Sequence, residues 1–114
     1  MYIKRTIKQH ISNHISRPEI TLIVGPRQVG KTTLITEIGE ELKLQGKKVV
    51  SFNLDIEDDF VLFTTQSQLM NRLKLELGNE KGYVFIDEVQ RKENAGRFFK
   101  GIYDMKHPYK FILT

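Results

Sequence analysis

The chain has 114 residues, a formal net charge of +4, no cysteine, 39% hydrophobic residues and 28% charged residues. This length allows one globular domain, and the lack of cysteine excludes disulfides, thiolate nucleophiles and Cys-zinc sites. No apolar run approaches the roughly 18 residues that a membrane span needs, and the basic first residues lack the apolar core of a signal peptide. We therefore expect a cytoplasmic protein with no membrane partner. The basic balance suits phosphate-bearing partners, nucleic acid included, although a mildly basic solvated surface is the plainer interpretation.

Hydrophobic spacing predicts alternating helices and strands. Isoleucines recur every fourth position over residues 2–16, which is typical of an amphipathic helix, and Gly78 is the expected stop of a later helix. Asp55–Asp59 looks like an acidic turn. The expected elements are, in chain order, a helix over 2–16, a strand over 20–24, a helix over 32–44, a strand over 49–54, a helix over 66–77, a strand over 83–86, a helix over 94–106 and a strand over 110–113.

This alternation predicts an α/β fold with a parallel sheet covered by helices on both faces. We divide the chain into an N-terminal helix, residues 1–17, and a nucleotide-binding core, residues 18–114. A parallel sheet normally continues into another crossover, so a chain that stops on a strand is expected to be a fragment or the product of a shortened gene. On this view the final strand is unpaired and leaves apolar surface exposed, which favours self-association.

A phosphate-binding loop is predicted between the first core strand and the following helix. The segment 25–32 reads G-P-R-Q-V-G-K-T and matches G-x-x-x-x-G-K-[ST] in the strand–loop–helix context that the motif requires. Its glycines let successive N–H groups turn inward at a helix N-terminus, where they form an anion cradle. A chance match is the alternative. The expected nucleotide-binding residues are Gly25, Pro26, Arg27, Gln28, Val29, Gly30, Lys31, Thr32 and Thr33. Of these, Lys31 reaches the β- and γ-phosphates and is also assigned a catalytic role, Thr32 ligates Mg²⁺, and Thr33 donates to the α-phosphate.

A second acidic site follows the apolar strand 83–86. Asp87 and Glu88 stand where ligands bind to parallel sheets, outside the carboxyl ends of the strands. We expect Asp87 to hold Mg²⁺, mostly through water, and Glu88 to orient the water that attacks the γ-phosphate. A solvated strand end is the plainer interpretation of an Asp-Glu pair, but the phosphate loop upstream favours the catalytic one.

The segments GPRQVGKTTL, YVFIDEVQ, ENAGRFFKGIYDM and YKFILT together resemble the AAA-family ATPases of archaea and bacteria. The resemblance runs from about Arg5 to the last residue. It implies a three-layer P-loop NTPase sandwich with strand order 1-4-3-2, truncated after its fourth strand. It also implies that Thr114 lies beside the γ-phosphate as a sensor residue, with an arbitrary chain end as the alternative. Finally, it implies a further C-terminal domain beyond these residues.

The implied function is ATP binding and Mg²⁺-dependent ATP hydrolysis that drives conformational work in a larger protein, which we expect to be able to form homo-oligomers. A nucleotide-gated switch with little turnover is the alternative, and a small-molecule kinase is a weaker one. Two further clusters have a plainer explanation as solvated surface: His10 and His14, which are spaced to face one metal, and the acidic run 55–59, which could contact a second metal or substrate.

Overall fold

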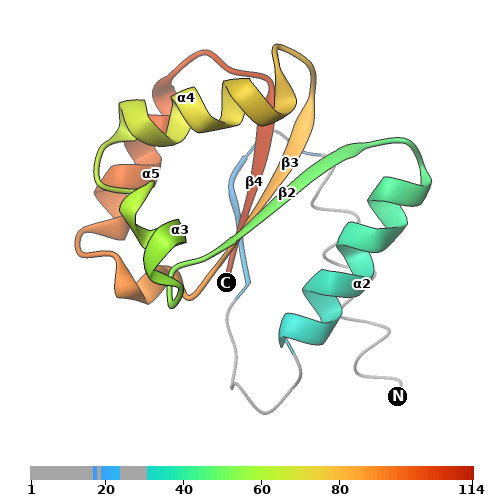
Figure 1. Cartoon of the computed structure of the whole chain (residues 1–114), viewed down its shortest axis with the longest axis horizontal. Helices are drawn as coiled ribbons and strands as arrows, with labels where there is room; N and C mark the ends of the chain where they lie inside the picture. Colours follow the sequence, from blue (N-terminus) through green and yellow to red (C-terminus); the bar gives the residue numbers. More distant parts are fainter. Residues whose placement is uncertain (1–16, 18, 24–30) are drawn as a thin grey trace.

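The computed structural model describes residues 17, 19–23 and 31–114. For residues 31–34, at the start of a helix, it describes the backbone but not the side chains. The predicted helix over 2–16 and the phosphate loop over 25–30 lie outside the described residues. The elements are β1 (Thr21–Leu22), α2 (Lys31–Leu44), β2 (Lys48–Asn53), α3 (Glu57–Val61), α4 (Gln66–Leu77), β3 (Gly82–Asp87), the short 3₁₀ helix η2 (Val89–Arg91), α5 (Ala95–Asp104) and β4 (Tyr109–Leu113). Figure 1 shows their arrangement.

The strands form one parallel sheet in the order β1-β4-β3-β2. This order and the α/β class confirm the prediction of a P-loop NTPase-like fold. Neighbouring strands end level with one another, since Asn53 of β2 pairs in register with Asp87 of β3 and Ile86 with Leu113 of β4. The carboxyl ends of β2, β3 and β4 therefore share one edge of the sheet, which is where ligands of open parallel sheets bind.

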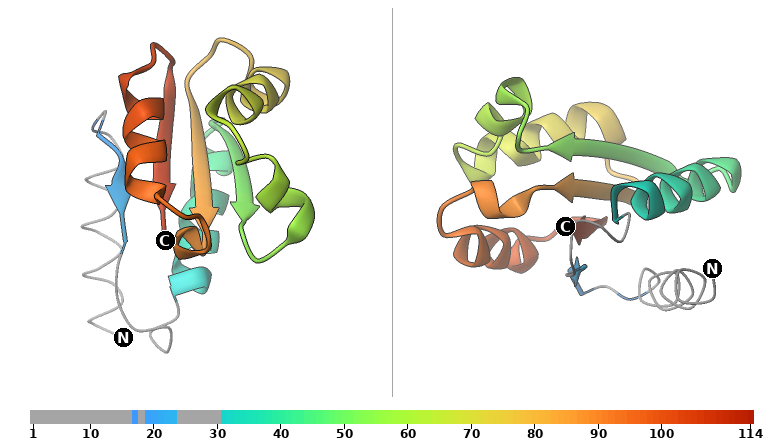
Figure 2. Two further views of the ribbon diagram at one scale, coloured as in Figure 1. Left: turned by 90° about the vertical axis from the view of Figure 1, so that its left-hand side faces the viewer. Right: turned by 90° about the horizontal axis from the view of Figure 1, so that it is seen from below.

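Helices cover both faces of the sheet, as the views in Figure 2 show. The alternation of β3 explains this, because successive side chains of a strand point to opposite faces. Val84 and Ile86 belong to the core beneath α4 and α5, whereas Tyr83 and Phe85 pack with Ile38 of α2 on the other face. A strand buried on both sides reads as a continuous apolar run, which is how the segment 83–86 appears in the sequence.

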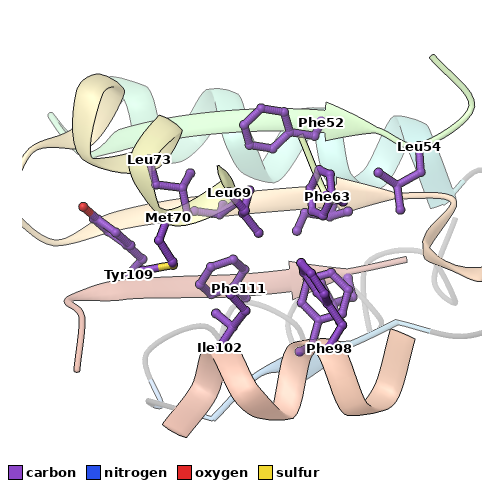
Figure 3. Packing of buried hydrophobic residues seen from close by; sticks show 14 of the residues in the cluster. Phe52, Leu54, Phe63, Leu69, Met70, Leu73, Phe98, Ile102, Tyr109 and Phe111 are labelled. Atoms are coloured by element: carbon purple, nitrogen blue, oxygen red, sulfur yellow. The ribbon is translucent and has the colours of Figure 1, made fainter. Parts of the chain in front are cut away.

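The larger core is rich in phenylalanine and joins α4 and α5 to the sheet (Figure 3). Phe63, which precedes α4, is fully buried and its ring centroid lies 5.7 Å from that of Phe52 in β2. Phe98 and Phe99 of α5 pack edge to face at 5.1 Å. Such aromatic contacts add to the stabilisation from burial. Through Phe63 they join β2 to α5, and so fasten the helical layer to the sheet whose carboxyl edge carries the candidate site.

The expectation that the last strand is unpaired and exposes apolar surface is wrong. β4 lies between β1 and β3, and all five of its residues are buried. The expected strand order already requires this placement. Among the described strands, the two-residue β1 is an edge of the sheet, lengthened by a hydrogen bond from the Ile23 N–H to the carbonyl oxygen of Leu113 at 2.8 Å.

Two local predictions need adjustment. The acidic run 55–59 is only partly a turn, because α3 begins at Glu57 and places three carboxylates in its first turn, where the helix dipole favours negative charge. The helix predicted over 94–106 spans Ala95–Asp104. The helix predicted over 66–77 has those bounds: Thr65 accepts a hydrogen bond from the Gln68 N–H at 3.1 Å, and Gly78 ends the helix with a positive φ of 68°.

Candidate functional site

The carboxyl ends of β3 and β4 bring Asp87, Glu88 and Thr114 together. The hydroxyl of Thr114 donates to Oδ1 of Asp87, and the backbone N–H of Glu88 donates to the same oxygen at 2.9 Å. Thr114 itself is anchored by its own N–H, which donates to the carbonyl oxygen of Ile86 at 2.9 Å. Two donors on one oxygen set the orientation of the Asp87 carboxylate, and hard oxygen ligands of this kind suit Mg²⁺.

Glu88 adopts the left-handed conformation, with φ 59° and ψ 44°. A residue with a Cβ pays roughly 1–2 kcal/mol for this geometry, so the turn after β3 is strained where the predicted catalytic carboxylate lies. Strain of this kind clusters at functional sites. The Glu88 carboxylate accepts a hydrogen bond from the Gln90 side-chain amide, and the backbone N–H of Val89 donates to the carbonyl oxygen of Thr114 at 3.0 Å. The turn is thus tied to the end of β4.

A cleft of about 330 Å³ opens between α2 and the carboxyl ends of β2 and β3. It is lined by Thr36 and Gly39 of α2, Asn53 of β2, Asp87 and Thr114, among others. Its volume lies at the lower end of the range for small-molecule sites. Asp87 and Thr114 therefore line a cleft next to the helix that follows the predicted phosphate loop.

The predicted phosphate-loop residues are only partly described. Gly25, Pro26, Arg27, Gln28, Val29 and Gly30 lie outside the described residues, and Lys31, Thr32 and Thr33 form the start of α2 without described side chains. Figure 1 shows that α2 begins at the end of the sheet where β3 and β4 terminate. The amino terminus of a helix carries partial positive charge and unpaired N–H groups, so the helix end that should bind phosphate is at the same edge as Asp87.

An ion pair links the turn after β3 to the loop after β2. The Arg91 guanidinium lies 2.6 Å from the Asp55 carboxylate, 36 positions earlier in the chain. In the same loop, Asp59 accepts the backbone N–H of Asn53 at 3.0 Å. The acidic run 55–59 therefore serves local structure, and no group of three potential ligands is found among the residues that the structure describes. His10 and His14, the other metal hypothesis, lie outside the described residues.

Asn53 lines the same cleft and is a candidate that the sequence analysis did not name. It stands beside Asp87 in the β2–β3 register, and its side-chain oxygen accepts the backbone N–H of Asp55 at 2.8 Å. A polar residue at the carboxyl end of a predicted strand was the available signal, by the same rule that singled out Asp87.

The chain belongs to the AAA domain family, because residues 17–114 match the model of that family. The family is one of nucleotide-binding, ATPase-type P-loop domains, in agreement with the strand order and with the resemblance noted from the sequence. No curated protein and no solved structure matches the chain. None of the helices in the described part is long and apolar enough to cross a membrane.

Proposed function

We propose that the protein binds ATP with Mg²⁺ at the carboxyl edge of the sheet and hydrolyses it, and that the hydrolysis drives conformational work in a larger AAA-type protein. The observation that supports this most directly is the convergence of Asp87, Glu88 and Thr114 beside the start of α2. The family membership supports nucleotide binding, and the donor chemistry of the site fits the rest: a carboxylate for a hard cation, a hydroxyl for a phosphate oxygen, and a second carboxylate for water.

The proposed roles follow from the chemistry of each side chain. Gly25, Pro26, Arg27, Gln28, Val29 and Gly30 form the loop around the phosphates. Lys31, Thr32 and Thr33 follow it, with Lys31 on the β- and γ-phosphates, and Thr32 and Asp87 as ligands of the cation. Bound Mg²⁺ would neutralise negative charge on the phosphates. Thr114 orients Asp87 and senses the γ-phosphate.

Glu88 is the proposed base. Its carboxylate would accept a proton from the water that attacks the γ-phosphate, a contribution typically worth about 10²–10⁴-fold in rate. The hydrogen bond from Gln90 holds this carboxylate in the arrangement described. For hydrolysis, the Glu88 side chain must exchange this partner for the attacking water, or accept from both.

The same contact favours a second candidate function, a nucleotide-gated switch with little turnover. A carboxylate engaged by Gln90 is less able to accept a proton from water. In such a switch, ATP occupancy alone would control association with a partner, which could be a second copy of the chain or a C-terminal domain of the same protein.

Nucleotide binding is tested by Lys31→Ala, with Lys47→Ala as the matched control because Lys47 is an exposed lysine in the turn after α2. We expect calorimetry with ATP and Mg²⁺ to show saturable binding in the unmodified protein and in Lys47→Ala, and a large loss of affinity in Lys31→Ala. Equal affinities in all three proteins would place the nucleotide elsewhere. Hydrolysis is a separate question, and the Glu88 variant discussed below separates the ATPase from the switch.

A further inference from the structure

A second cavity lies at the opposite end of the sheet from the candidate nucleotide site. Its volume is about 630 Å³, and it is lined by residues that include Arg17, Lys81, Tyr103, Tyr109 and Lys110. Tyr109 and Lys110 begin β4, whereas Thr114 follows its last residue. The two cavities have no lining residue in common. The chain thus has a cavity with three cationic side chains that the proposed ATPase function does not use.

Lys110 is the most unusual of these residues, because only 3% of its surface is exposed. Its ammonium donates to the carbonyl oxygen of Glu19. The two residues lie level with each other, because each stands two positions before a member of the Thr21–Ile112 pair that joins β1 to β4. Burial lowers the pKa of Lys110 to about 8, with the positive charges of Lys81 and Arg17 acting in the same direction and Glu19 opposing them. An ammonium has three N–H donors, and the described contacts give this one a single acceptor.

The negative groups near the cavity are fewer than the cations. The Glu19 carboxylate acts on Lys110 and raises its pKa, against the three cations Arg17, Lys81 and Lys110. Asp104 also lines the cavity, but its carboxylate lies 3.8 Å from the Lys100 ammonium. His107 is held neutral: one ring nitrogen accepts the backbone N–H of Tyr109 at 3.1 Å, and the other lies 3.0 Å from the carbonyl oxygen of Ile102, to which it must donate. Burial also lowers the pKa of His107.

The walls of the cavity are aromatic as well as cationic. Tyr103 is 47% exposed, and the rings of His107 and Tyr109 stack at 5.5 Å with an interplanar angle of 19°. The Lys81 ammonium lies 5.7 Å from the ring centroid of Tyr83, which belongs to the core beneath α2 and does not line the cavity. The volume falls within the range of about 300–1,000 Å³ for small-molecule sites and exceeds what an isolated phosphate ion requires. Tyr109 is buried in the core beneath α4 and α5, so Tyr103 is the lining tyrosine with an exposed ring. An exposed ring near three cations suits a phosphate group carried on a planar organic molecule.

We propose that this cavity is a second, non-catalytic binding site for a phosphate-bearing ligand, with Arg17, Lys81 and Lys110 as the phosphate contacts. A buried ammonium is unfavourable unless its N–H groups and its charge are both compensated, and Lys110 has the charge of Glu19 but a single described acceptor. A phosphate at this position would supply the acceptors that the Glu19 carbonyl alone does not, and charge-assisted hydrogen bonds to phosphate are among the stronger polar contacts. The phosphate could come from a free nucleotide or from the end of a nucleic-acid strand, since both carry it beside a planar base.

The test is residue-resolved binding by NMR in a Lys31→Ala background, which removes the proposed phosphate contact at the first site. The probes are AMP, inorganic pyrophosphate and a short single-stranded oligonucleotide with a 5′-phosphate. We expect saturable shifts at Lys81, Tyr109 and Lys110 with AMP. A tighter response to the oligonucleotide would identify a nucleic-acid end as the source of the phosphate, and a response to AMP alone a free nucleotide.

Two variants and a matched control assign the contacts. Lys81→Ala and Lys110→Met should each weaken AMP binding by about tenfold or more, as expected for loss of a charged hydrogen bond. Lys74→Ala, an exposed lysine on α4 away from the cavity, should leave it unchanged. Because Lys81 is exposed, its replacement keeps the proposal testable even if Lys110→Met fails to fold.

Proton uptake gives an independent readout. An anion beside Lys110 favours its charged form, so calorimetry near pH 8 in buffers of different ionisation enthalpy should show protons taken up as AMP binds, and Lys110→Met should lose that uptake. The proposal is overturned if shifts are confined to the start of α2, if no probe saturates, or if Lys81→Ala and Lys74→Ala bind AMP equally well.

Discussion

Thr114 and Asp87, 27 positions apart in the sequence, are joined by a hydrogen bond from the threonine hydroxyl to Oδ1 of the carboxylate. Thr114 is in turn fixed by its own backbone bond to Ile86 at 2.9 Å. The orientation of the predicted metal ligand on β3 therefore depends on a residue at the end of β4. This relationship gives Thr114 a role even before any phosphate is bound.

Replacing Thr114 by valine keeps the side-chain shape and removes the hydroxyl. We expect Thr114→Val in the full-length protein to lower ATP turnover by about 10–100-fold, because a hydrogen bond to a charged group contributes roughly 1.5–3 kcal/mol. The same variant should need a higher Mg²⁺ concentration to reach its half-maximal rate. Thr114→Ser retains the donor and should stay close to wild type. Phosphate release measured over a range of Mg²⁺ concentrations checks both effects. An unchanged Mg²⁺ dependence in the valine variant would mean that Thr114 does not position Asp87.

Glu88→Gln separates the two proposed functions. Glutamine has the same shape but cannot accept the proton of the attacking water, so turnover in the full-length protein should fall by about 10²–10⁴-fold while ATP affinity is preserved. Calorimetry and multi-turnover phosphate release provide the two measurements. If the wild-type protein binds ATP but its slow turnover is the same in the glutamine variant, the switch is favoured over the ATPase.

The left-handed backbone at Glu88 makes a prediction about stability alone. Glycine adopts a φ of 59° without strain, so Glu88→Gly should be more stable to unfolding than Glu88→Ala by about 1 kcal/mol. Both variants lack the Gln90 contact, so the comparison isolates the backbone. Asn94, with φ 56°, offers a matched pair in which glycine should again exceed alanine. Urea unfolding measures both pairs, and equal stability within the Glu88 pair would argue against the strained turn.

Much of the fold could be predicted because strand and helix periods are local. The helix over 66–77 was identified with its stop at Gly78, and the apolar run 83–86 marked the central part of β3. What could not be predicted depends on tertiary contacts. Lys110 is buried because β4 is inserted between β1 and β3. Neither the charge of a lysine nor its spacing from other residues predicts such burial.

The candidate site shows the same division. Asp87 and Glu88 are predicted as site residues from their position after an apolar strand, and Thr114 from the family resemblance; their proximity is what the structure adds. Three features of the site were not predicted: the left-handed backbone at Glu88, its contact with Gln90, and the ion pair between Arg91 and Asp55. Each depends on backbone geometry or on a contact between side chains. A single sequence carries no pattern for such contacts, because each side chain is compatible with many partners in solution.

Gly82 stands where a side chain does not fit. A Cβ at this position would lie 2.8 Å from Cδ1 of Leu77, which is itself fully buried at the end of α4. We expect Gly82→Ala to lower the free energy of unfolding by about 1–3 kcal/mol, as overpacked cores do. Gly96→Ala is the control: a Cβ there meets nothing within 4 Å, and alanine favours the helix, so stability should be unchanged or raised by up to about 1 kcal/mol. Thermal unfolding of both variants tests this contrast.

His107 predicts a loss of stability in mild acid. Burial holds its pKa below the ordinary value of 6.5, so the unfolded chain binds a proton more readily than the folded protein. The stability contributed by neutral His107 is therefore complete above pH 6.5 and is lost as the pH falls toward its folded-state pKa. His107→Asn keeps an acceptor for the Tyr109 N–H but cannot titrate, and should flatten the dependence between about pH 5 and 7. The same slope in both proteins would contradict this assignment.

The position of β4 also sets the order in which the molecule can assemble. Lys110 meets the Glu19 carbonyl across 91 positions of chain, and closing a loop of that length costs about 4 kcal/mol of chain entropy. During synthesis, β1 has no described strand to pair with until β4 leaves the ribosome. Local contacts can form α4 and α5 earlier, but Thr114 meets Asp87 only once β4 has emerged. A nascent chain of this protein should therefore complete its sheet and its candidate site together.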